Sequence, residues 1–381
     1  MESIYLDHAA TSPMHPEVIA VMADVMQNYY GNPSSIHHLG RSASYKLEEA
    51  REVIAKSLDV KPHEIIFNSG GTEGDNTAIL ETAFSRQTQG KHLITTRIEH
   101  PAVLNTMRYL EDKGFEVTYL TVDQKGRISL DELQAALRTD TILVSIMYGN
   151  NEIGNLLPVK EIGELLKEHP AYFHTDAVQA YGNQTIRPHE WGIDLLSTSA
   201  HKVNGPRGVG FLYKNDDIRL PSLLHGGEQE EKRRAGTENL AGICGFAKAI
   251  ELLTLEERDN RAQAYLQFTK TILQSLDEAG IDYEVNGELE NKLPHILNLR
   301  FNGIASDLLL MKLDLKGIAI STGSACTAGN VDPSHVLEEM YGKNASEVKE
   351  SVRVSFGYGN TEAEIQRFIQ ELIAAIQQLR K

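Results

Sequence analysis

The 381-residue sequence contains only two cysteines, Cys244 and Cys326. Two cysteines are too few for a framework of disulfides or for a zinc site built from cysteine ligands. The sequence also lacks an uncharged apolar run of the roughly 18 residues that a membrane-spanning helix needs. Glu2 and Asp7 interrupt the pattern of a signal peptide, so we expect a cytoplasmic protein that does not enter a membrane.

Basic residues are scarce relative to acidic ones: 37 Lys+Arg stand against 53 Asp+Glu, a net charge of −16 with histidine neutral. Such a surface repels a phosphate backbone, which argues against direct nucleic-acid binding. The motifs HExxH, GxGxxG, GxSxG and the Walker loop are absent, and this disfavours several large enzyme classes. The overall composition, 41% hydrophobic and 24% charged, is typical of a globular protein.

What the sequence does contain is an alternation of short strands and helices. Runs rich in β-branched residues predict seven strands, at residues 64–68, 92–95, 116–122, 141–148, 172–176, 194–199 and 208–213. Amphipathic stretches predict helices between most of them, at residues 72–84, 101–111, 129–137 and 159–169. This alternation predicts an α/β domain with a mainly parallel seven-stranded sheet. The last two strands have no helix between them, so we expect at least one antiparallel strand.

The pattern changes after Thr237. Apolar residues at helical spacing over residues 240–250 predict a helix that leaves the sheet. Further strands are predicted at residues 296–301, 318–320 and 351–356, with a helix at 306–315 and a final helix capped by Thr361 and Glu364. We predict a large domain over residues 16–259 and a smaller α+β domain formed by residues 1–15 and 260–381.

Several predicted strand ends carry polar residues, and ligands of open α/β sheets bind beyond such ends. Gly70, Gly71 and Thr72 lie between a strand and a helix, where free amides form an anion site, although an ordinary capped turn has the same pattern. Asp176 either caps a helix that starts at Ala177 or keeps a pyridine nitrogen protonated. Lys202 follows an apolar strand, so its amine either lies in solvent or reaches into the crevice and forms a Schiff base.

The two cysteines and one arginine have contrasting settings. Cys244 lies on an apolar helical stripe, which predicts an inert, buried thiol. Cys326 lies among small and polar residues, which predicts an accessible thiol on a mobile loop, with a chance loop cysteine as the alternative. Strand alternation places Arg353 on the face opposite its apolar neighbours, where it is either a surface charge or a clamp for a carboxylate.

Taken together, these segments resemble the pyridoxal-phosphate enzymes of the aspartate aminotransferase fold, and more narrowly the cysteine desulfurases of the NifS/IscS type. The resemblance extends over nearly the whole chain. It is carried most specifically by RAGTEN at residues 234–239 and GSACT at residues 323–327. Other matching segments lie at residues 5–11, 31–35, 99–100 and 150–154.

The resemblance implies pyridoxal 5′-phosphate as the cofactor and a role for each matching residue. Lys202 would hold the cofactor covalently, and Asp176 would pair with its ring nitrogen. Gln179 would bond the ring hydroxyl, while His100 would stack on the ring and assist proton transfer. The phosphate would be bound by Gly71, Thr72, Ser199 and His201.

The resemblance also implies a homodimer, because a residue matching Thr237 reaches the phosphate of the neighbouring subunit in this family. Asn151 and Arg353 would hold the substrate, L-cysteine. Cys326 would attack the substrate sulfur as a thiolate, with a protonated His100 as one source of the cation that ionises it. The products would be L-alanine and a persulfide on Cys326.

The persulfide would pass to a sulfur-acceptor protein, such as an iron–sulfur scaffold or a tRNA-thiolating enzyme. No resident metal is expected, although Cys326 itself could serve as an iron–sulfur ligand. Two rival interpretations remain open at this point. One is another enzyme of the same fold, such as an aminotransferase or a selenocysteine lyase, and the other is a non-catalytic interaction scaffold.

Overall fold

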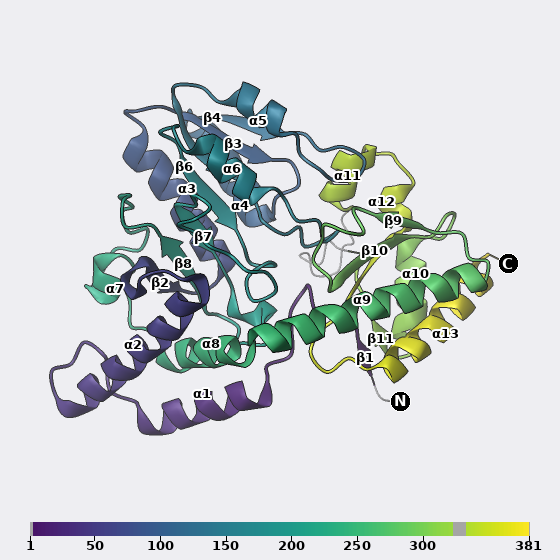
Figure 1. Ribbon diagram of the computed structural model, residues 1–381, viewed down its shortest axis with the longest axis horizontal. Helices are drawn as coiled ribbons and strands as arrows, with labels where there is room; N and C mark the ends of the chain where they lie inside the picture. Colours follow the sequence, from purple (N-terminus) through teal and green to yellow (C-terminus); the bar gives the residue numbers. More distant parts are fainter. Residues whose placement is uncertain (1–2, 323–332, 381) are drawn as a thin grey trace.

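The computed structural model describes residues 3–322 and 333–380 (Figure 1). It confirms the predicted mainly parallel sheet of seven strands, which lie in the order β2-β8-β7-β6-β5-β3-β4. Only β8 runs antiparallel to its neighbours in this sheet, as expected for a strand reached without a helix. The strands are β2 (Ile65–Asn68), β3 (His92–Thr96), β4 (Glu116–Leu120), β5 (Thr141–Ser145), β6 (Tyr172–Asp176), β7 (Leu195–Ser197) and β8 (Gly210–Lys214).

Helices cover the sheet and bury its apolar side chains. The predicted connecting helices are α3 (Gly71–Arg86), α4 (Pro101–Asp112), α5 (Leu130–Ala136) and α6 (Val159–Leu166). Two helices that the sequence patterns did not predict, α1 (Pro16–Asn28) and α2 (His38–Leu58), pack against α8 (Leu240–Leu252). Short elements complete this part: η1 (Pro62–Glu64), η2 (Ala200–Lys202) and α7 (Gln229–Lys232).

A second hydrophobic core lies beside the first and is built from the two ends of the chain. It contains an antiparallel sheet ordered β12-β10-β9 and a parallel pair of β1 with β11. Its elements are β1 (Ile4–Tyr5), α9 (Leu255–Glu278), β9 (Glu284–Asn286), β10 (Ile296–Arg300), α10 (Ser306–Asp314), β11 (Ile318–Ala319), β12 (Ser351–Ser355) and α13 (Glu362–Leu379). The helices α11 (His335–Tyr341) and α12 (Glu347–Glu350) precede β12 in the chain, but their buried side chains belong to the first core. The capping box of Thr361 and Glu364 at the start of α13 is present as predicted.

The helix α9 runs from the end of α8 along the second core (Figure 1). Its buried residues, including Phe268 and Ile272, belong to that second core. The predicted domain boundary at residues 259 and 260 falls inside this 24-residue helix. The division of the chain into two domains remains a prediction.

The N-terminal segment crosses from the second core to the end of the large sheet. Ser12 donates its backbone N–H to the carbonyl of His201 at 2.9 Å, and its hydroxyl accepts the N–H of Asn204 at 2.8 Å. These bonds hold residues 9–12 against the strand ends where polar residues were predicted to gather. Among the described helices, none is long and apolar enough to cross a membrane.

Candidate active site

A cavity of about 260 Å³ lies at the carboxyl ends of β6 and β7. It brings together residues from the N-terminal segment, the large sheet and β12. Nearly all the predicted site residues line it, namely Gly71, Thr72, His100, Asn151, Asp176, Gln179, Ser199, His201, Lys202 and Arg353. Residues from distant parts of the sequence therefore line one cavity.

One end of the cavity is suited to an anion. The helix α3 begins at Gly71 after Gly70, whose φ of 139° favours glycine. A methyl group added at Gly71 would lie 2.6 Å from a side-chain carbon of Val178, so the close approach requires a glycine. The backbone N–H groups of the first turn of α3 have no partner within the helix, and they lie beside the hydroxyls of Thr72 and Ser199.

His201 lies at the same end of the cavity. Its Nδ1 lies 3.1 Å from the Thr11 hydroxyl. Burial, with Lys202 and Arg207 nearby, lowers the pKa of His201 to about 4. The imidazole is therefore neutral at physiological pH and contributes a hydrogen bond rather than a charge.

Asp176 ends β6 and is buried, with 5% of its surface exposed. Its Oδ1 accepts the backbone N–H of Val178 at 2.9 Å, and a turn rather than a helix follows. Burial raises the pKa of Asp176, and the charges of His100 and Lys202 act in the opposite direction. A cation placed against this carboxylate would remove the cost of burying it.

His100 caps the helix α4. Its Nδ1 accepts the backbone N–H of Ala102 at 3.1 Å, so Nδ1 carries no proton and a neutral ring has its proton on Nε2. Burial lowers the pKa of His100, assisted by the charges of Lys202 and His335 and opposed by Asp176. Both effects disfavour the protonated imidazole, and a protonated His100 as the source of a cation stays a prediction.

Lys202 is the last residue of η2, directly beyond β7. Its Nζ donates to the carbonyl oxygens of Ala9 at 2.6 Å and Ala10 at 2.8 Å. The side chain is half-buried and lines the cavity, so the solvent-exposed alternative for this lysine is wrong. The strand end and the 3-10 turn together carry the amine into the crevice.

Arg353 lies in the middle of β12 and is only 1% exposed. Its neighbours Val352 and Val354 pack into the second core, which turns the guanidinium toward the cavity as strand alternation predicted. The guanidinium donates to the Asn151 carbonyl and to Asp7 Oδ1, each at 2.7 Å. Its Nε–H is buried with no hydrogen-bond partner among the described residues. The surface-charge alternative is therefore wrong.

The remaining predicted residues have different positions. Gln179 donates from Nε2 to the Ala9 carbonyl at 2.9 Å and lines the cavity. Thr237 is exposed and lies outside the cavity, in a neighbouring hollow. Cys244 is buried as predicted, and burial raises its pKa to about 11. Cys326 lies outside the described residues.

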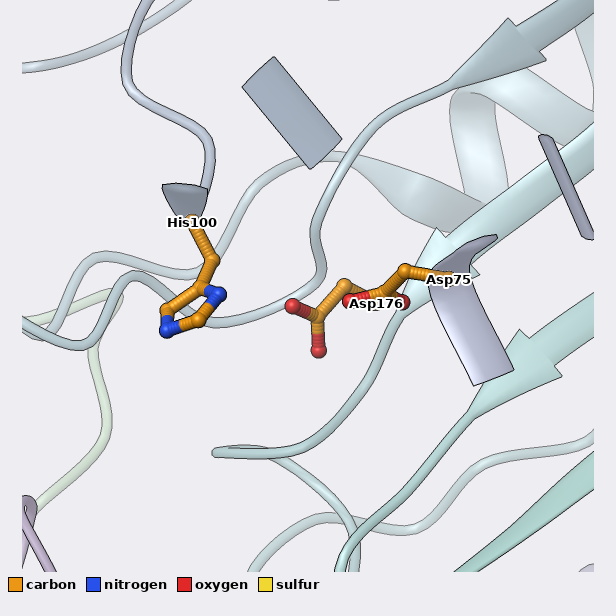
Figure 2. A group of neighbouring side chains, drawn as sticks. All are labelled: Asp75, His100 and Asp176. Carbon is orange, nitrogen blue, oxygen red and sulfur yellow. The ribbon is translucent and has the colours of Figure 1, made fainter. Parts of the chain in front are cut away.

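Two acidic residues near the cavity were missed by the sequence analysis. Asp75 on α3 lines the cavity, and Figure 2 shows its carboxyl group together with Asp176 and His100. One side-chain oxygen or nitrogen atom from each of these three residues lies within 4.8 Å of the others. Glu99 is fully buried, and burial raises its pKa to about 8. Asp75 lies one helical turn after Thr72, and this spacing was the signal that could have identified it.

The residues present fit the cofactor that the sequence resemblance implies. The first turn of α3, whose backbone N–H groups lack helical partners, suits a phosphate group. The buried carboxylate of Asp176 suits a protonated ring nitrogen. The unpartnered Nε–H of Arg353 suits a substrate carboxylate.

Comparison with known proteins is consistent with this arrangement. The family model for class-V aminotransferases matches residues 4–368. A protein of Bacillus subtilis (strain 168) named "Putative cysteine desulfurase IscS 1" is 52% identical over 379 residues, which cover 100% of both chains.

Solved structures give the same result for the fold. One described as "NIFS-LIKE PROTEIN" superimposes with a TM-score of 0.92 at 35% identity, covering 99% of this chain and 100% of the other. Another, described as "SspA in complex with cysteine", has a TM-score of 0.82 at 36% identity and covers 93% of this chain and 99% of the other.

Proposed function

The chain belongs to the class-V aminotransferase family, and from this membership and the cavity we propose that it is a pyridoxal-phosphate-dependent cysteine desulfurase. The observation that carries the proposal is that Lys202, Asp176 and Arg353 line the same cavity. The name of the 52%-identical relative and the cysteine complex of the 36%-identical structure support cysteine as the substrate.

The proposed reaction converts L-cysteine and the Cys326 thiol into L-alanine and a Cys326 persulfide. The carbon–sulfur bond of the substrate breaks, and a sulfur–sulfur bond to Cys326 forms. The hydrogens of the two thiols and the Cα proton are redistributed between alanine and the persulfide, so the atoms balance without an added oxidant or reductant. The persulfide sulfur then passes to an acceptor protein.

The cofactor would be held by residues already placed in the cavity. Lys202 would bind it covalently, Asp176 would pair with its ring nitrogen, and Gln179 would bond its hydroxyl group. Its phosphate would occupy the anion end, formed by Gly71, Thr72, Ser199 and His201. When bound, the cofactor supplies an electron sink for the pair released when the substrate Cα loses its proton.

The chain's own residues supply positioning and proton transfer. Arg353 and Asn151 orient the substrate through its carboxylate, and the buried setting of the guanidinium strengthens that interaction. The Lys202 amine holds the proton taken from the substrate Cα. The Nδ1 of His100 accepts a backbone N–H, which leaves Nε2 available for moving a proton within the cavity. The imidazole ring of His100 would stack on the cofactor ring.

The proposal includes a homodimer, in which Thr237 of one subunit would bind the phosphate of the other. The exposed position of Thr237 outside its own cavity supports this arrangement. We also propose a cytoplasmic location and an acceptor that is an iron–sulfur scaffold or a tRNA-thiolating enzyme.

Purified protein reconstituted with pyridoxal phosphate tests the proposal. Wild-type protein should absorb visible light and form alanine from L-cysteine. Lys202→Ala should lose the covalently bound cofactor because the only proposed attachment point is removed. A colourless wild-type protein would favour a non-catalytic scaffold and would contradict the proposal.

Cys326→Ala separates the desulfurase from other enzymes of the fold. It should retain the visible absorbance of the cofactor and lose sulfur release from cysteine, whereas Cys244→Ala, the matched control, should retain both. Undiminished sulfur release by Cys326→Ala would refute Cys326 as the nucleophile.

A further inference from the structure

Asp75 is a buried acid that the proposed reaction does not use. It lies on α3, is 1% exposed, and lines the cavity. One of its carboxyl oxygens lies within 4.8 Å of a ligand atom of both Asp176 and His100 (Figure 2). A second carboxyl group therefore stands beside the one that is proposed to meet the cofactor nitrogen.

Within the described part of the chain, Asp75 forms no ion pair with a charged base. The nearest basic group is His174, whose Nε2 lies 3.5 Å from Asp75 Oδ1. Burial lowers the pKa of His174 to about 3, so that imidazole is neutral. Its two nitrogens already contact the hydroxyls of Ser145 at 2.8 Å and Ser197 at 2.9 Å.

The other charged groups near Asp75 are acids. Burial raises the pKa of Asp75 most strongly, Asp176 and Glu99 raise it further, and a hydrogen bond with the Ser197 side chain acts in the opposite direction. In residues 3–322 and 333–380, no lysine or arginine forms an ion pair with Asp75. Two ionised carboxylates this close in a buried site repel each other strongly, so one of them holds a proton.

The choice between the two carboxyl groups follows from their partners. Asp176 Oδ1 accepts a backbone N–H and lies near Lys202, and both interactions favour its ionised form. For Asp75 the one hydrogen bond that favours the ionised form comes from the Ser197 side chain, and Asp75 Oδ1 has no hydrogen-bond partner among the described residues. The ionised form is therefore better supported at Asp176 than at Asp75.

We propose that Asp75 is a positioning residue of the cofactor site, which holds a proton so that Asp176 carries the one negative charge facing the cofactor nitrogen. This inference rests on the proposed function, because it assigns Asp75 a role toward the proposed cofactor. It adds a residue that acts through Asp176 and does not touch the substrate.

The test compares Asp75→Asn, which imitates the protonated acid, with wild-type holoenzyme. Infrared spectra at pH 8 of protein labelled with ¹³C-aspartate should show a protonated carboxyl band that is lost in Asp75→Asn. At this pH Asp194, whose pKa is raised to about 6, is ionised and does not contribute. Asp112→Asn, at an exposed acid, is the matched control and should retain the band.

A second measurement follows the visible absorbance of the holoenzyme as the pH changes. The midpoint should move by less than a few tenths of a pH unit in Asp75→Asn, because a neutral group replaces a neutral group. Removing an ionised carboxylate this close would shift it by on the order of one unit or more. Such a shift, or wild-type protein without the protonated band, would overturn the proposal.

These outcomes are distinct from failure of the proposed function. If wild-type protein bound no cofactor, the visible absorbance would be missing, which refutes the cofactor assignment and the role of Asp75 with it. If the cofactor bound and the protonated band were missing, only the proposal for Asp75 would fail.

Discussion

Replacing Arg353 by lysine tests the proposed carboxylate clamp most directly. In the structure two guanidinium nitrogens are held at 2.7 Å by the Asn151 carbonyl and Asp7, which leaves Nε–H unpaired and aligned by these two bonds. Lysine keeps the positive charge but cannot present a planar pair of N–H groups. The variant should lose one charge-assisted hydrogen bond to the substrate, or about 1.5–3 kcal/mol. This energy corresponds to a fall in kcat/KM of roughly 10- to 150-fold.

The assay is alanine formation over a range of cysteine concentrations. Because Arg353 is proposed to bind the substrate rather than the cofactor, the loss should appear mainly as a raised KM. The visible absorbance of the holoenzyme should be the same as that of wild type. These two readouts separate a substrate role from a general disturbance of the cavity.

Arg300→Lys is the matched control. Arg300 lies on β10, paired with β12, and its guanidinium binds Glu284, Glu347 and Glu350 away from the cavity. Its kinetic constants should equal those of wild type. If Arg353→Lys also kept its KM within twofold of wild type, the reasoning that assigns the substrate carboxylate to Arg353 would be refuted.

Three further variants test other features of the structure. Gly71→Ala should weaken cofactor binding, measured by titrating cofactor-free protein, because the added methyl group would lie 2.6 Å from a side-chain carbon of Val178. An unchanged affinity would contradict the close contact between Gly71 and Val178. Glu230→Gln breaks a buried ion pair with Arg51 and should therefore lower the free energy of unfolding, measured in urea, by about 3–5 kcal/mol. Glu48 is the exposed partner of the same arginine, so the control Glu48→Gln should lower it by less than about 1 kcal/mol. Burial lowers the pKa of His295 from 6.5 to about 3, so the unfolded chain binds a proton that the folded chain cannot, and stability falls as the pH drops from about 6.5 toward 3. His295→Gln should reduce this fall by up to about 1.4 kcal/mol per pH unit in urea titrations at several pH values, and an unchanged pH dependence would contradict it.

The parts of the fold that could be predicted are those whose signal is local. The strand β6 matches its predicted limits because alternating and apolar residues mark a buried strand within a few positions. Local sequence patterns also placed Asp176 and Lys202 beyond the ends of strands, where ligand sites form in α/β sheets. Helices α1 and α2 were missed because the alternation of strands and helices on which the prediction rests begins only after them.

The parts of the site that the sequence analysis missed depend on contacts between distant segments. The pairing of Arg353 with Asp7 joins two segments at opposite ends of the chain, and local periodicity carries no information about such a contact. The lowering of the His100 pKa depends on how deeply its ring is buried, which a sequence does not specify. The roles of Thr237 and Cys326 stay predictions.

The pairing of β1 with β11 and the bridge from Asp7 to Ser355 have a consequence for biosynthesis. β1 leaves the ribosome long before β11 and β12, which receive the N-terminal segment, are translated. Until then, the carbonyls of Ala9 and Ala10 lack the tether that holds them against Lys202. A nascent or prematurely terminated polypeptide would thus lack a finished lysine pocket, and vitamin-derived cofactor would be captured only by molecules whose translation had passed the final strand.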